Sequence, residues 1–319
     1  MTTPPAGVRV PSASSDVTSE GWVVTCDLAF DVVEPAEIAL ALAAADGHRV
    51  ISERLDSRSD GGRLTGPTEL AGPHGGRLHL LRAPAGLLSV SYRAELAGSG
   101  PAPVPGSASV SGSVSVSGWA PVAGAAPTSG PGPTDPGLPD LDQLIYLRPS
   151  RYCPSDHIVG FAVAEFGHLA PGRPRVEAIT DWIHDRVGYV AGSSAVHDTA
   201  EDTLLTGQGV CRDFAHLGIT LCRALQIPAR FVGVYAPGLT PMDFHAVFEA
   251  WVDDAWWLYD ATRKVPRPSL VRIATGRDAA DAAFASVLRG IASLRTIEIT
   301  ATVSGVLPED EHRESVRIT

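Results

Sequence analysis

A long proline- and glycine-rich stretch divides the chain and limits what can fold on either side of it. Residues 97–139 contain nine prolines among repeated Gly, Ser and Ala. This composition cannot bury enough apolar surface to form a core, so the stretch is predicted to be a linker. Residues 107–117 alternate Ser with Val and could add to a sheet as an edge strand, although their glycines weaken that interpretation.

The segment before the linker, residues 1–96, is predicted to be a small antiparallel β domain, folded as a sandwich. Turn sequences such as Asp46-Gly47 separate short runs rich in Val, Leu, Ile and Thr, and no stretch has helical periodicity. The role of this domain stays open between substrate presentation, docking and stabilisation. The expected strands cover residues 21–33, 36–45, 48–55, 77–82 and 87–96.

The segment after the linker, residues 140–305, is predicted to be an α+β domain that folds without the first one. Helices come first along the chain and antiparallel strands follow, and the charged tail at residues 306–319 is expected to fray. Helices are expected at 174–187, at 200–206 between a Thr199 cap and Gly207, and at 211–226 before Pro228. Strands are expected at 229–235, 246–252, 255–259 and 296–303.

Cys211 follows a glycine-rich turn, Gly207-Gln208-Gly209, at the start of the strongest helical pattern in the chain. A helix N-terminus favours a thiolate over a thiol, and its free N–H groups can hold the oxyanion of an attacked carbonyl. The helix is expected to be amphipathic. One side has Phe214, Gly218, Leu221, Cys222 and Leu225, and the other has Arg212, His216, Thr220 and Arg223.

His245 and Asp260 follow Cys211 in the order that a thiol nucleophile, a base and an orienting carboxylate require. His245 comes 34 residues after Cys211, at the head of an aromatic run, and Asp260 ends the next such run 15 residues later. Two antiparallel strands joined by a tight turn would place the two side chains together. The carboxylate would then fix the imidazole tautomer and stabilise the imidazolium.

Four ordered motifs resemble the bacterial transglutaminase-like superfamily, whose members are often described as cysteine proteases. They are Gly209-Val210-Cys211-Arg212-Asp213-Phe214-Ala215-His216, Ile227-Pro228-Ala229-Arg230-Phe231-Val232, Asp243-Phe244-His245-Ala246 and Tyr259-Asp260-Ala261-Thr262-Arg263; Tyr146 to Ser155 resembles the usual start of that domain. The resemblance covers roughly residues 141–300. It implies a papain-like α+β core with Cys211 as nucleophile, His245 as base and Asp260 as orienting residue, and no cofactor.

Other residues near these motifs have less certain roles. His216 is expected to be structural or to form a wall of the cleft, and Arg212 and Asp213 to brace the helix start. Gln208 and Trp182 are the candidate side-chain donors to the oxyanion. The loop at residues 236–242 is either a substrate wall or a simple connector.

Three classes of function remain open. The favoured one is acyl transfer or hydrolysis at an amide bond of a peptide or protein, for example of glutamine, through a thioester on Cys211. An acetyl-CoA-dependent arylamine N-acetyltransferase uses the same triad, but the sequence has no basic patch for the CoA phosphates. A non-catalytic binding module on the same fold is the third.

Composition excludes several partners. The net charge of −11 argues against a nucleic-acid backbone or an anionic membrane as partner. Four cysteines without a disulfide framework, no signal sequence and no apolar run long enough for a membrane helix predict a cytoplasmic protein. The histidines have no zinc-site spacing, so no metal is expected. The oligomeric state stays open.

Overall fold

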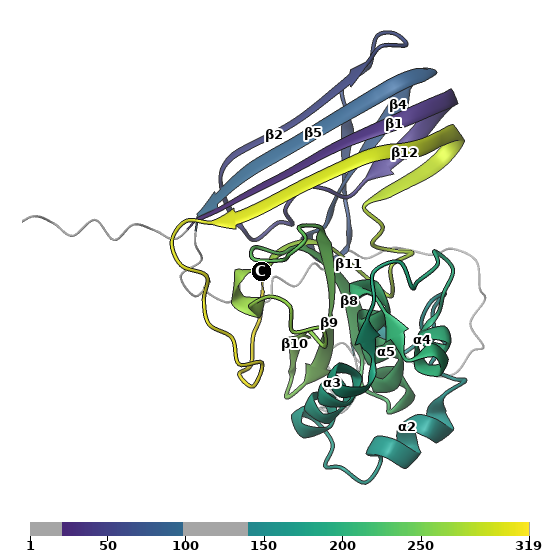
Figure 1. Cartoon of the computed structure of the whole chain (residues 1–319), viewed down its shortest axis with the longest axis vertical. Helices are drawn as coiled ribbons and strands as arrows, with labels where there is room; N and C mark the ends of the chain where they lie inside the picture. The colour runs from purple at the N-terminus through teal and green to yellow at the C-terminus, as the bar shows by residue number, and fades with distance from the viewer. Residues whose placement is uncertain (1–20, 98–139, 319) are drawn as a thin grey trace, which may run out of the picture.

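The computed structural model describes residues 21–97 and 140–318, which form two lobes (Figure 1). One lobe is an antiparallel sheet, and the other combines helices with a second sheet. The predicted linker lies outside the described residues apart from Ala97, and the possible edge strand at 107–117 lies outside them entirely. Within the described ranges, no helix is long and apolar enough to cross a membrane.

The first lobe contains one six-stranded antiparallel sheet, so the predicted sandwich of two separate sheets is wrong. Its central strand β1 (Gly21–Leu40) pairs along one edge with β5 and then with β4. The two predicted runs at 21–33 and 36–45 are therefore largely one bent strand, with register shifts near Glu34. The outer strands are β2 (Arg49–Ser59) and β3 (Thr68–Ala71), beside β5 (Gly86–Ala97) and β4 (Arg77–Ala83) respectively.

The other edge of β1 pairs with β12 (Ala285–Val303), which corrects the predicted domain boundary at residue 305. The sequence assigned a strand at 296–303 to the second domain, but β12 is antiparallel to β1 from Trp22↔Val303 to Leu40↔Ala285. Hydrophobic patterning does not report which sheet a strand joins, because both sheets offer antiparallel partners. The first lobe is thus built from both ends of the chain.

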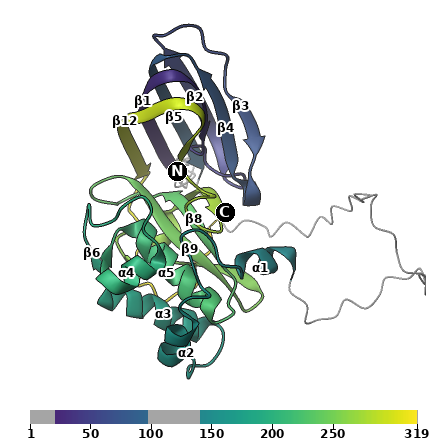
Figure 2. The same ribbon diagram turned by 90° about the vertical axis from the view of Figure 1, so that its right-hand side faces the viewer.

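The second lobe has the predicted α+β organisation. Its sheet has the order β10-β9-β8-β11, with α5 packed against β8 and β9. Figure 2 shows α1 on the opposite side of this sheet from α3, α4 and α5. The helices are α1 (Leu141–Tyr146), α2 (Val159–Phe166), α3 (Arg173–Arg186), α4 (Ala200–Thr206) and α5 (Cys211–Ala224). The strands are β6 (Gly188–Tyr189), β7 (Gln208–Gly209), β8 (Ala229–Tyr235), β9 (Phe244–Val252), β10 (Ala255–Tyr259) and β11 (Val271–Gly276).

Helix α5 has the predicted apolar and polar sides, but it is buried on both of them from Asp213 onward. His216, Thr220 and Arg223 are all buried, and the contacts of His216 and Arg223 come from the segment at residues 148–152, from Phe231 and Ala229 in β8, and from the loop at residues 277–279. Arg223 is tolerated there because its guanidinium donates to the carbonyl oxygens of Ala229, Arg148 and Arg277.

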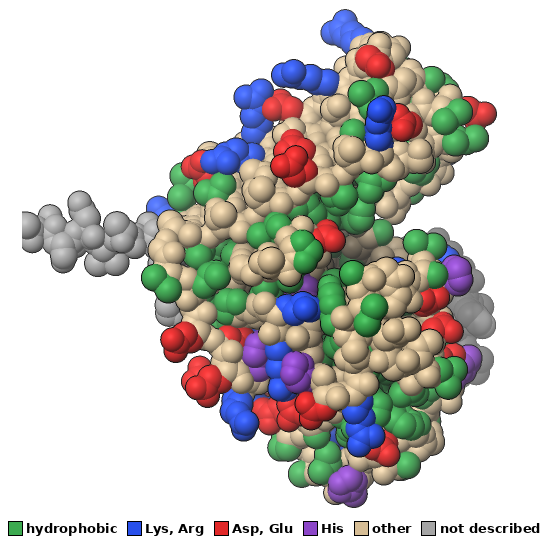
Figure 3. Space-filling model, in the orientation of Figure 1, with side chains coloured by type: hydrophobic (Ala, Val, Ile, Leu, Met, Phe, Trp, Pro, Cys, Tyr) green, Lys and Arg blue, Asp and Glu red, His purple; other side chains and the backbone are tan. Residues whose placement is uncertain are grey.

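The two lobes share one continuous hydrophobic core. The rings of Tyr92 in β5 and Tyr235 in β8 stack with centroids 6.4 Å apart, and the Tyr235 hydroxyl donates to the Leu42 carbonyl at 2.8 Å. The Trp22 indole donates to the Ser269 carbonyl at 2.9 Å. Although Figure 3 shows the surface indented between the lobes on the right-hand side of the view, the contact beneath is closely packed.

Residues 306–318, which we call the C-terminal strap, return from β12 to the second lobe, so the prediction that this tail frays is wrong. Val316 forms a β-bridge with Leu258, the last but one residue of β10, and is 9% exposed. Asp310 forms an ion pair with Arg267 in which both side chains are 3% exposed. The charged composition did not reveal this docking, because the ion pair of Asp310 forms with a distant residue, Arg267.

Candidate active site

Cys211 is the first residue of α5 and is held there by the turn that the sequence indicated. Gly207 ends α4 in the left-handed conformation at φ 67°, and Gly209 passes so close to α5 that a Cβ would lie 2.7 Å from Cβ of Asp213. The Asp213 carboxylate accepts from the Val210 N–H at 2.8 Å and thereby caps the helix. Arg212 braces the same turn through Asp213 and the Ala195 carbonyl. Asp213 and Arg212 therefore occupy the bracing positions that were expected.

Helix α5 approaches strand β9 very closely at Gly218, seven residues after Cys211. A Cβ on Gly218 would lie 2.5 Å from Cε1 of Phe248 in β9. His216 points into the interior and is fully buried, with its ring stacked on Tyr152 at 5.1 Å between centroids. It therefore has the structural position that the sequence allowed.

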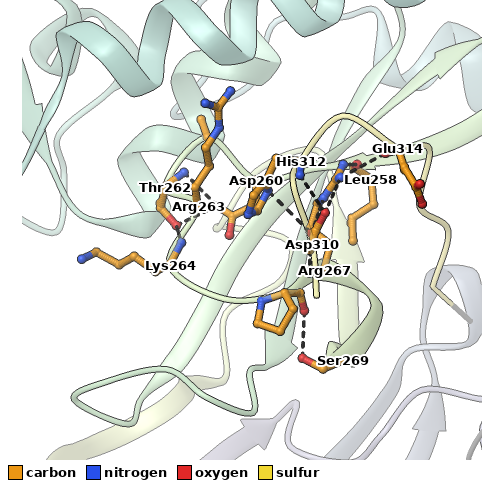
Figure 4. Close-up of polar contacts among 12 residues, drawn as sticks. Leu258, Asp260, Thr262, Arg263, Lys264, Arg267, Ser269, Asp310, His312 and Glu314 are labelled. Atoms are coloured by element: carbon orange, nitrogen blue, oxygen red, sulfur yellow. Dashed lines mark hydrogen bonds and ion pairs between the residues drawn. The ribbon is translucent and has the colours of Figure 1, made fainter. Parts of the chain in front are cut away.

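Strands β9 and β10 bring His245 and Asp260 together. The register Phe248↔Tyr259 continues past the end of β10, so Asp260 follows on the face of the sheet that carries His245. Nε2 of His245 lies 3.0 Å from Oδ2 of Asp260, and both side chains are almost fully buried. The other carboxylate oxygen accepts from the N–H of Thr262 at 2.9 Å and from its hydroxyl at 2.7 Å. Figure 4 shows Thr262 beside Asp260.

The electrostatics of this pair favour its charged form. Burial alone would lower the pKa of His245, but the Asp260 carboxylate raises it to about 10, and the Cys211 thiol adds to the increase. Burial alone would raise the pKa of Asp260, but His245 and Thr262 hold it below its usual range. An imidazolium is therefore stable here well above neutral pH.

The second imidazole nitrogen is available to the thiol. Nδ1 of His245 is buried and makes no hydrogen bond to any described residue. Cys211 is among the groups that raise the pKa of His245, after the Asp260 carboxylate. The structure thus joins His245 to Asp260 through Nε2, and Cys211 is the candidate partner of Nδ1.

The loop after Asp260 is fixed against α3. Nδ1 of His184 lies 3.1 Å from the carbonyl oxygen of Ala261, and Arg263 forms an ion pair with Asp181. Arg267 then donates to the Leu258 carbonyl at 3.1 Å, two residues before Asp260. The C-terminal strap holds Arg267 in turn, as Figure 4 shows. The position of the carboxylate therefore depends on helix α3 and on the strap.

The two candidate oxyanion donors lie on different elements, and their role stays a prediction. The Trp182 ring packs edge-to-face on Phe161 and Phe166 at 5.6 and 6.1 Å, in the contact between α2 and α3. Gln208 is exposed on β7. Tyr189, which the sequence did not single out, has Cys211 among the groups that raise its pKa, after burial. It lies on a two-residue strand, which is too short to give a periodic signal.

The loop at residues 236–242 lies between β8 and β9. Leu239 in it is buried, and a Cβ on Gly238 would lie 2.7 Å from a methyl group of Leu307. The loop therefore contacts the chain leading into the strap, while its use as a substrate wall stays a prediction. Among residues 21–97 and 140–318, no group of three or more His, Cys, Asp or Glu side chains is arranged to hold a metal ion.

Comparison with known proteins places this geometry in a family. Residues 163–261 match the family model of the transglutaminase-like superfamily. A crystal structure of a "putative cysteine protease" from Cytophaga hutchinsonii matches with a TM-score of 0.72 and 33% identity, over 91% of this chain and 92% of that one. The chain belongs to the transglutaminase-like superfamily. The resemblance and the α+β fold class read from the sequence are thereby confirmed.

A curated relative matches a smaller part of the transglutaminase-like chain. The uncharacterized protein ML0607 of Mycobacterium leprae (strain TN) is 32% identical over 158 residues, which is 47% of this chain and 55% of that protein. The match thus spans about half of the relative's length. The family and the Cytophaga structure together support a thiol-dependent hydrolase or transferase in general.

Proposed function

We propose that this protein catalyses acyl transfer or hydrolysis at an amide bond of a peptide or protein, with Cys211, His245 and Asp260 as its triad. The observation that supports this best is the buried pair between Nε2 of His245 and Asp260 at 3.0 Å, which leaves Nδ1 without a partner among the described residues. A base fixed by a carboxylate on one nitrogen and open toward a thiol on the other is the arrangement that activates a nucleophile.

The reaction follows from these positions. Sγ of Cys211, as a thiolate, bonds to the amide carbon, and the carbonyl electron pair moves to oxygen. When the carbonyl reforms, the C–N bond breaks and the amine or ammonia leaves with a proton from the His245 imidazolium. Water or a second amine then gives its proton to His245 and attacks the thioester, which releases the acyl group and restores Cys211. Asp260 keeps its charge throughout and orients the imidazole.

The acyl acceptor determines which enzyme this is. Incubation with a glutamine-containing peptide library, with and without a primary amine, followed by mass spectrometry separates cleaved, deamidated and amine-linked products. We expect one of these three, absent from Cys211→Ala. If acetyl-CoA alone acetylated Cys211, the arylamine N-acetyltransferase would replace this proposal, and no modification by any donor would favour the binding module. We propose a cytoplasmic location for the reaction, where the thiol stays reduced.

Alkylation by iodoacetamide tests the thiol itself. Cys26, Cys153 and Cys222 are buried, and burial is the main cause that raises the pKa of each thiol. Faster labelling of Cys211 alone therefore proves little, since it is the more exposed thiol. The decisive quantity is the pH dependence of the rate at which iodoacetamide alkylates Cys211. Because the His245 imidazolium persists to about pH 10, we expect this alkylation rate to change less than about threefold between pH 6 and 9.

In His245→Gln, the alkylation rate of Cys211 should rise about tenfold per pH unit, as it does for an ordinary thiol below its pKa of about 8.5. Glutamine keeps a donor for Asp260, so the variant avoids a buried unpaired carboxylate. His216→Gln is the matched control, because His216 is equally buried and accepts a hydrogen bond from the Ala279 N–H on the far side of α5. If His245→Gln left the profile flat, the triad would be refuted.

A further inference from the structure

The ribbon formed by β6 and β7 aims one side chain at the start of α5. The two strands are parallel, with Tyr189 opposite Gly209, and the Val190 N–H donates to the Gly209 carbonyl at 3.0 Å. Gly209 faces Asp213, because a Cβ there would lie 2.7 Å from Cβ of that residue. Paired residues of neighbouring strands point to the same face, and successive residues point to opposite faces. Tyr189 therefore points toward α5, whereas Gln208 points away from it.

Two ring contacts fix the Tyr189 side chain at that place. Its centroid lies 5.8 Å from that of Phe214, in the first turn of α5, and the Lys264 ammonium lies 4.1 Å from the centroid. Lys264 belongs to the loop that follows Asp260. Tyr189 thus lies between the nucleophile's helix and the loop of the orienting carboxylate, and it remains 38% exposed to solvent.

The Tyr189 hydroxyl stays protonated at physiological pH. Burial and the neighbouring Cys211 thiol raise the pKa of this phenol to about 12. A phenol that keeps its proton beside a thiolate is a hydrogen-bond donor. The Trp182 indole, by contrast, lies against Phe161 and Phe166 in the contact between α2 and α3.

We propose that the Tyr189 hydroxyl and the backbone N–H of Cys211 together bind the oxyanion of the tetrahedral intermediate. The role rests on the proposed function, because the oxyanion forms only when Sγ of Cys211 bonds to the carbonyl carbon and the carbonyl electron pair moves to oxygen. The two donors stabilise that charge until the C–N bond breaks and the carbonyl reforms. Lys264 acts as a positioning residue that holds the phenol ring.

Two reactions of the same thiol separate this role from a structural one. Acylation of Cys211 by p-nitrophenyl acetate passes through an oxyanion, whereas alkylation by iodoacetamide is a direct displacement without one. Loss of a single oxyanion donor costs on the order of 100- to 1000-fold in amide hydrolysis, and an activated ester needs less help. We therefore expect Tyr189→Phe to lower acylation roughly 10- to 100-fold and to change alkylation less than about twofold.

Tyr152→Phe is the matched control. The Tyr152 hydroxyl donates to the Val196 carbonyl at 3.0 Å, and its ring stacks on His216, so the variant should leave both rates unchanged. If Tyr189→Phe acylated at the wild-type rate, or if both of its rates fell equally, the oxyanion role would be wrong while the triad stood. If wild type showed no acylation that depends on Cys211, the proposed function and this role would fall together.

Discussion

Replacing Asp310 by Asn tests whether the C-terminal strap stabilises the fold around Asp260. The Asp310 carboxylate accepts from the N–H, Nε and Nη2 of Arg267, each at 2.8 Å. Asparagine keeps the size of the side chain, but it removes the charge and turns an amide NH₂ toward the guanidinium. Arg267 would then be left buried without a counter-charge.

The structure gives the size of the effect. Both side chains are 3% exposed, and breaking a buried ion pair costs about 3–5 kcal/mol. With the lower value of about 3 kcal/mol, the effect is the smallest that a buried pair predicts. For a protein of this size each kcal/mol corresponds to about 2–4 °C, which gives a fall in Tm of about 6–12 °C.

Thermal unfolding followed by circular dichroism at pH 7 measures this shift. Asp31→Asn is the matched control, because Asp31 pairs with Arg295 at 3.3 Å while the two side chains are 51% and 58% exposed. Such a surface pair contributes about 0–1 kcal/mol, so the control should melt within about 4 °C of wild type. Equal melting temperatures of the two variants would refute the role assigned to the strap.

The pH dependence provides a second measurement on the same variant. Burial would raise the pKa of Asp310, but the hydrogen bonds from Arg267 hold it far below its usual range. Stabilisation by a carboxylate with a depressed pKa is complete above the unfolded value of about 4 and is lost as pH falls. The difference in Tm between wild type and Asp310→Asn should therefore narrow between pH 7 and pH 3. A constant difference would contradict this assignment of charge.

Two further predictions concern packing and domain organisation. The fragment 140–319 should not unfold cooperatively, because β12 would lack its partner β1 and the shared core would be open to water. Its Cys211 should also lose the pH-independent alkylation rate expected of the whole protein. A sharp thermal transition of the fragment would support the domain boundary predicted from the sequence. Gly218→Ala should destabilise the protein by about 1–3 kcal/mol in urea unfolding, because the new Cβ would lie 2.5 Å from the Phe248 ring. Gly160→Ala in α2 is the control, since open space surrounds its Cβ, and it should be neutral or stabilising. Equal urea midpoints of the two variants would show that the Phe248 ring moves aside freely.

Local signals in the sequence were sufficient for much of the second lobe. The Thr199 cap, the Gly207 stop and the aromatic runs gave α4, β8 and β10 with the bounds that the structure has, because caps, turns and alternation are written within a few residues. The order of Cys211, His245 and Asp260 was also readable. It needed only one helix start and one hairpin to bring the three residues together.

Features that depend on distant partners were not readable in this way. The partners of His216 and Arg223 could not be read from α5, because they lie in the segment at residues 148–152 and in the loop at residues 277–279. Tyr189 was missed because its role comes from pairing with Gly209 across twenty residues of chain. The strap appeared free because the partner of Asp310 lies in the loop after β10.

The path of the chain after β11 explains why the two lobes form one folding unit. β12 leaves the second lobe and pairs with β1 in the sheet of the first lobe, and the C-terminal strap then returns to the end of β10. There Arg267 links the strap to the Leu258 carbonyl, two residues from Asp260. Because β12 pairs with β1 directly before the strap begins, the first sheet anchors the segment that contacts Arg267. The N-terminal lobe therefore supports the candidate active site through the C-terminal end of the chain, although the residues proposed to react all lie in the other lobe.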